Sequence, residues 1–126
     1  ADQIEPERIM DPDDLIAGQA LVRRVPVGEK VAEAILTLVR AGRPETSDLK
    51  NVCEHLSWGP GPRASQALML GARARAVMEG RLAPSVDDVI ALAHPILRHR
   101  MALTFAARAE GVTLASIIDG LCERIG

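Results

Sequence analysis

Apolar residues recur every three or four positions along much of this chain, and this spacing constrains the fold more than any other feature. One such run consists of Val31, Ala34, Ile35 and Leu38. A period of 3.6 residues places these side chains on one face of an α-helix, and no segment shows the alternation typical of a β-strand. The core must be built from Leu, Ile, Val, Ala and Met, because the chain has only one Trp and one Phe. This composition favours helices, so we expect an all-α fold.

Helix caps and breakers divide the chain into a small bundle of about five helices. The expected helices span about 12–23, 28–41, 62–79, 85–97 and 113 onward, with one further turn near 49–55. Ser85, followed three residues later by Asp88, forms a capping box at the start of the fourth helix. Gly80 ends the third helix, and Thr113 caps the last one. Pro95 is expected to kink or split the fourth helix.

Length and charge limit the domain organisation and the partners. A chain of 126 residues with 48% apolar residues is long enough for one domain with a buried core. We expect residues 1–10 to be a flexible acidic leader and residues 11–126 to form a single helical domain. The net charge of −2 argues against nucleic-acid binding, including by a helix-turn-helix. The sequence shows no signal peptide and no membrane span, so we expect a cytoplasmic protein.

Cysteines and histidines offer little chemistry. Cys53 and Cys122 have no CxxC spacing, and we expect free structural thiols. The candidates for a metal site are His94, His99, Asp87 and Asp88. The two histidines lie five residues apart, whereas a spacing of four places two imidazoles on one helix face. We therefore expect no metal site, and we expect the histidines to pack or form hydrogen bonds near Pro95.

The remaining charged residues give no catalytic pattern. Five arginines could form a basic surface: Arg73, Arg75, Arg81, Arg98 and Arg100. A solvated face with scattered ion pairs is the expected arrangement. The sequence contains no GxSxG, no HExxH and no Gly-rich phosphate loop ending in Lys-Ser or Lys-Thr. We expect no catalytic residue in this chain alone.

Arg63 occupies an unusual position in the first turn of the third helix. The unpaired N–H groups of a helix N-terminus carry about half a positive charge, so an arginine there is unfavourable by roughly a few tenths of a kcal/mol. Pro62 suits the first helical position, because its missing N–H would be unpaired anyway. Helical counting places Arg63 at the head of an apolar stripe expected to meet the core: Ala67, Leu70, Ala74 and Val77.

Two interpretations of Arg63 remain open on the residues alone. A guanidinium beside a helix N-terminus is a good receptor for a phosphate, because side chain, dipole and backbone donors attract the same anion. In the other interpretation, Arg63 pairs with an acid of the Glu45–Asp48 loop.

Four blocks of sequence occur in a fixed order between Val27 and Leu121. They are Leu38–Pro44, Trp58–Ala76, Ser85–Arg100 and Ala109–Thr113. Together they resemble the helical lid that follows the α/β nucleotide-binding core in the MoxR branch of AAA+ ATPases. The resemblance implies that Arg63 is the sensor-2 arginine, which reaches the γ-phosphate of ATP. It also implies that Pro62 and Ala64, on either side of Arg63, pack against the nucleotide.

The chain lacks the other parts of such an ATPase. It has no Walker A loop, Walker B acids, sensor-1 residue or arginine finger, so we expect it to be the C-terminal lid of a longer protein. ATP and Mg would then be bound mainly by the missing core. The resemblance implies a chaperone-like ATPase for assembly or cofactor insertion of protein complexes. Its implied partners are the core domain, neighbouring ring subunits and a von Willebrand factor A-type protein.

A different class of function is a free-standing helical adaptor, descended from such a lid, that binds protein through an uncovered Val/Leu-rich surface. The upstream reading frame distinguishes the adaptor from the lid of a longer ATPase. A Gly-rich loop ending in Gly-Lys-Ser or Gly-Lys-Thr before Ala1 supports the lid, and a start codon near Ala1 supports the adaptor.

Overall fold

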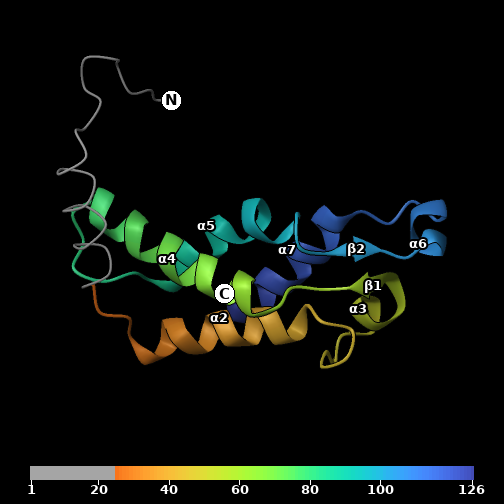
Figure 1. Cartoon of the computed structure of the whole chain (residues 1–126), viewed down its shortest axis with the longest axis horizontal. Coiled ribbons are helices and arrows are strands. Elements are labelled where there is room, and N and C mark those ends of the chain that lie inside the picture. The colour runs from red at the N-terminus through yellow and green to blue at the C-terminus, as the bar shows by residue number, and fades with distance from the viewer. Residues whose placement is uncertain (1–24) are drawn as a thin grey trace, which may run out of the picture.

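The computed structural model describes residues 25–126, so the predicted acidic leader and the predicted helix at 12–23 lie outside the described residues. The elements are α2 (Glu29–Ala41), α3 (Lys50–His55), β1 (Leu56–Trp58), α4 (Pro62–Met78), α5 (Val86–Leu97), β2 (Ala102–Leu103), α6 (Phe105–Ala109) and α7 (Leu114–Ile125). Figure 1 shows an elongated bundle, with α3, β1, β2 and α6 gathered at one end. The all-α prediction is confirmed, and each predicted helix within the described part is present to within a few residues.

The core is aliphatic and lies between α2, α4, α5 and α7. Its largest fully buried apolar side chains are Leu38, Val52, Leu68, Val89, Leu97, Ile117, Ile118 and Leu121. Small residues on α4 allow α5 to approach closely. A Cβ added at Gly71 would lie 2.9 Å from Cδ1 of Leu92. Gly71 therefore leaves room for the Leu92 side chain, which a larger residue at this position would displace.

The sequence pattern predicts the wrong buried face for α4. The residues that it buries are spaced four apart: Ala64, Leu68, Ala72 and Ala76. Arg63 is exposed and Leu70 is 51% exposed, so both lie on the outer side of the helix. The buried face is made mostly of alanine, whose short side chain gives a weak hydrophobic signal. The larger Leu70 and Val77 made the opposite face look like the core face.

Three predicted helix ends are confirmed. Ser85 and Asp88 form both hydrogen bonds of a capping box at the start of α5. The Thr113 hydroxyl accepts a hydrogen bond from the N–H of Ser116 and so caps α7. Gly80 has φ +74°, a backbone conformation that favours glycine, directly after α4.

Two features differ from the sequence-based expectation. β1 and β2 form an antiparallel pair, with Leu56 opposite Leu103. These strands have three and two residues, which is too short for alternation to be recognised. Pro95 does not split α5, which continues to Leu97. The buried contacts of α5 with the core compensate for the backbone bond that proline removes.

Within residues 25–126, no helix is long and apolar enough to cross a membrane.

Candidate functional site

Arg63 lies at an uncapped helix end. Gly61 precedes α4 and provides no side-chain cap, Pro62 occupies the first turn, and that turn contains no acid. The Arg63 side chain is exposed and forms no hydrogen bond or ion pair within residues 25–126. Within the described part of the chain, neither the positive end of the helix nor the guanidinium is paired with an anion.

The loop acids considered as partners of Arg63 are engaged elsewhere. Glu45 accepts a hydrogen bond of 2.7 Å from Nη2 of Arg43. Both carboxylate oxygens of Asp48 accept bonds from Arg124, at 2.6 and 2.5 Å. The hydrogen bond from Arg124 lowers the pKa of Asp48 below its ordinary value. The alternative ion pair between Arg63 and this loop is not formed.

The two residues beside Arg63 have different surroundings. Pro62 is exposed, so its ring can face a ligand. Ala64 has no exposed surface and belongs to the hydrophobic core. Its N–H donates to the carbonyl of Gly61 at 3.0 Å. In this conformation, Pro62 and Arg63 present surface to a ligand and Ala64 does not.

The loop before Arg63 packs directly against the end of α2. A Cβ added at Gly59 would lie 2.1 Å from the carbonyl oxygen of Gly42. Pro60 is fully buried, and a Cβ added at Gly42 would lie 3.2 Å from its ring. Two sequence blocks that resemble MoxR lids meet at this contact. Gly42 and Gly59 belong to this contact although no motif singles them out, and the glycine in each block is the sequence signal of close backbone approach.

Replacing Gly59 by alanine should disturb this loop. The new methyl group would overlap backbone atoms, which cannot move aside as a flexible side chain can, so we expect a loss of about 1–3 kcal/mol in the free energy of unfolding. Urea unfolding of the 126-residue chain measures the loss, and the fluorescence of the neighbouring Trp58 reports the loop. Gly61→Ala is the matched control, because its Cβ would have ordinary contact, 3.4 Å from Arg43. Equal stability of the two variants would contradict the tight contact.

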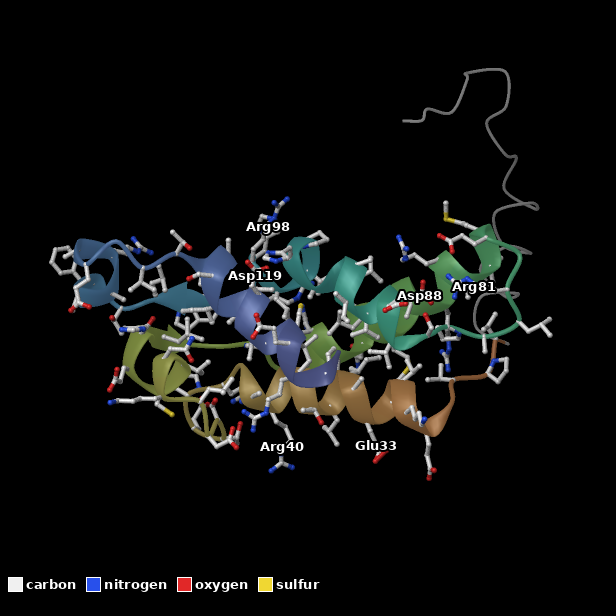
Figure 2. The ribbon with its side chains drawn as sticks, turned by 180° about the vertical axis from the view of Figure 1, so that it is seen from behind. Glu33, Arg40, Arg81, Asp88, Arg98 and Asp119 are labelled. Carbon is white, nitrogen blue, oxygen red and sulfur yellow. The ribbon has the colours of Figure 1, made fainter. Side chains whose placement is uncertain are left out.

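Two of the predicted surface arginines converge on one buried acid. Asp88 is 1% exposed and accepts bonds from Arg81 at 2.6 and 2.7 Å and from Nε of Arg75 at 3.1 Å. Figure 2 shows Arg81 beside Asp88 at one end of the bundle. The hydrogen bonds from Arg81 hold the pKa of Asp88 well below its usual range. Arg75 and Arg81, whose side chains are 40% and 34% exposed, form ion pairs as expected, but they share a buried acid and so fix the connection between α4 and α5.

The histidines form hydrogen bonds, as predicted. Nε2 of His94 lies 2.7 Å from Oδ1 of Asp119 and joins α5 to α7. His99 accepts a bond of 3.3 Å from Nε of Arg98. In the described part of the chain, no cluster of three or more His, Cys, Asp or Glu residues could hold a metal ion.

Both cysteines have free thiols, as predicted. Cys53 is exposed, whereas Cys122 is half-buried, and its burial raises the pKa of the thiol.

Comparison with known proteins agrees with the fold. The AAA lid domain family matches residues 49–121, more than half of the chain. Chaperone MoxR1 of Mycobacterium tuberculosis is 28% identical over 94% of this chain and 32% of its own length. YeaC, an uncharacterised protein of Bacillus subtilis, is 31% identical over 94% of this chain and 35% of its own length.

A solved structure also matches the fold of this chain. The crystal structure of a proposed ATPase from Cytophaga hutchinsonii matches with a TM-score of 0.84 and 27% identity, over 90% of this chain and 35% of that protein. The chain thus spans about a third of the length of each of these relatives. It belongs to the AAA lid domain family and is a MoxR-like member of it.

Proposed function

We propose that this chain is the C-terminal lid of a MoxR-like AAA+ ATPase and that Arg63 is its sensor-2 arginine, which binds the γ-phosphate of ATP. The observation that carries this proposal is the exposed guanidinium on an uncapped helix N-terminus. Placing a cation there is unfavourable in the isolated lid and becomes favourable when a triphosphate arrives. Pro62 lies beside the nucleotide, whereas Ala64 supports the helix from the core.

Arg63 acts on the charge of the transferred phosphoryl group. Negative charge is spread over the oxygens of this group in the transition state, and a preorganised arginine stabilises it without reorganisation. ADP lacks the γ-phosphate, so it gives Arg63 less to bind, and the lid position depends on which nucleotide is present. ATP and its Mg ion are held mainly by the core domain.

The outer face of α4 continues from Arg63 and meets the core domain. A groove of about 340 Å³ on this helix is lined by Ser65, Gln66, Met69, Leu70 and Arg73. Leu70 is 51% exposed on the same side as Arg63. Burying it against a second domain would remove apolar surface from water.

The intact protein works as a chaperone-like ATPase in the cytoplasm. It forms a ring with neighbouring subunits and acts with a von Willebrand factor A-type partner in assembly or cofactor insertion of protein complexes. The similarity to a protein named as a chaperone supports this role.

ATP turnover by the intact ATPase tests the role of Arg63. Arg63→Ala should reduce turnover strongly, and wild-type turnover in this variant would contradict the proposal. The 126-residue chain alone should show no ATPase activity. The upstream sequence separates this proposal from the adaptor, since only the lid requires a Gly-Lys-Ser or Gly-Lys-Thr phosphate loop before Ala1.

A further inference from the structure

A second arginine, Arg43, contacts the loop that leads to Arg63. We propose that Arg43 is a positioning residue: it holds the loop at residues 59–61 against α2 and thereby fixes Arg63 where the γ-phosphate binds. This inference rests on the proposed role of Arg63.

The guanidinium of Arg43 joins the loop to the segment after α2. Its Nη1 donates a hydrogen bond of 2.8 Å to the carbonyl of Pro60, and its Nη2 donates one of 2.7 Å to Glu45. Pro60 is fully buried, and removal of the arginine would take away the side-chain donor to its carbonyl. The Arg43 side chain is itself 34% exposed, with its two arms fixed by two different acceptors.

The backbone of Arg43 is anchored to the end of α2. Its carbonyl accepts bonds from the N–H groups of Thr46 at 3.1 Å and Ser47 at 2.8 Å. The Thr46 hydroxyl donates a bond of 2.7 Å to the carbonyl of Arg40, in the last turn of α2. The backbone of Arg43 is therefore held in place by hydrogen bonds, and its side chain extends from there to the loop.

The loop has few free torsions between this contact and Arg63. The rings of Pro60 and Pro62 fix their φ angles near −65°. The tight approach of Gly59 to Gly42 restricts the residue before them. Once the Pro60 carbonyl is held, Gly61 is the main remaining point of rotation before α4. Removing the Arg43 contact would therefore move the start of the helix.

The first experiment measures the loop in the 126-residue chain by hydrogen exchange. In Arg43→Ala, the amides of Ala64 and Ser65, which donate to the Gly61 carbonyl, should exchange about tenfold faster, while those of α7 should keep their wild-type rates. The anisotropy of Trp58, next to the loop, should fall. Arg40→Ala is the matched control, because Arg40 points away from the helices (Figure 2). Wild-type exchange at Ala64 and Ser65 in Arg43→Ala would overturn the proposal.

A lysine variant keeps the test valid if Arg43→Ala fails to fold. Lysine keeps the charge but lacks the planar fork, so Arg43→Lys can satisfy one of the two acceptors at a time. We expect intermediate exchange at Ala64 and Ser65 in this variant. Exchange equal to wild type in Arg43→Lys would show that the fork is not required and would overturn the proposal.

The second experiment uses a double-mutant cycle in the intact ATPase. Arg43→Ala should lower kcat about tenfold with less than about a twofold change in KM for ATP. Adding Arg43→Ala to Arg63→Ala should cause no further loss, because Arg43 acts through Arg63. Effects that multiply would overturn the proposal.

The two experiments separate failure of this inference from failure of the proposed function. Wild-type turnover in Arg63→Ala overturns the proposed function and the nucleotide-positioning part of this inference. Faster loop exchange in Arg43→Ala would then still support the contact between Arg43 and the loop. Slow turnover in Arg63→Ala combined with wild-type turnover in Arg43→Ala overturns only the positioning role.

Discussion

Asp88→Asn should lower the free energy of unfolding of this chain by about 2–3 kcal/mol. The Asp88 carboxylate is 1% exposed and accepts hydrogen bonds from two arginines and from the N–H of Ser85. Asparagine keeps the size but removes the charge and one acceptor. Arg75 and Arg81 are 40% and 34% exposed, so water can solvate them after the change. The expected loss therefore lies below that of a fully buried pair.

Urea unfolding followed by circular dichroism measures this loss, and Asp87→Asn is its control. Asp87 is exposed in the same first turn of α5, so this control removes the same charge from the helix N-terminus. A loss several times larger for Asp88→Asn is the expected result. Equal losses would show that only the helix dipole is involved.

The stability difference between wild type and Asp88→Asn should depend on pH. The bonds from Arg81 lower the pKa of Asp88 in the folded state, so its contribution is present above the unfolded carboxyl pKa of about 4. The contribution is lost as the pH falls toward the lower folded pKa. The difference should be constant from about pH 7 to pH 5 and should shrink below about pH 4. A difference that persists unchanged in acid would contradict the ion-pair explanation.

The sequence predicts a helix well where large apolar side chains and side-chain caps agree. In α7, the Thr113 cap is followed by Ile117, Ile118 and Leu121, all of them buried. In α4, by contrast, the buried positions are mostly alanine and Leu70 remains exposed, so the size of the side chains pointed to the wrong face. The short sheet depends on two segments far apart in the chain, and neither has a strand pattern of its own.

The site around Arg63 was predictable only where local sequence signals determine it. Pro62 marks the start of a helix in the sequence, so the first-turn position of Arg63 could be predicted from local rules. The bond from Arg43 to Pro60 spans 17 residues, and the approach of Gly59 to Gly42 spans a similar distance. Such contacts depend on how the loop packs on α2, which no local pattern encodes.

Arg63→Ala should lower kcat of the intact ATPase about a hundredfold or more, with a smaller change in KM for ATP. Loss of one preorganised donor to a developing oxyanion costs about 10²- to 10³-fold, and arginines at transferred phosphoryl groups can contribute more. Because the charge on the phosphoryl oxygens is stabilised mainly in the transition state, the effect should appear in kcat. Steady-state turnover over a range of ATP concentrations separates the two constants.

Arg63→Lys and Arg40→Ala are the controls for this result. Lysine keeps the charge but loses the bidentate geometry, so Arg63→Lys should retain part of the turnover. Arg40→Ala removes an exposed arginine from α2 and should leave kcat unchanged.

The free energy of unfolding of the 126-residue chain should respond to Arg63→Ala very differently from kcat. Arg63 is exposed at a positive helix end, so Arg63→Ala should leave the unfolding free energy unchanged or slightly raised. A marked loss of stability would show that Arg63 holds the lid together, which is incompatible with an arginine placed there for a phosphate.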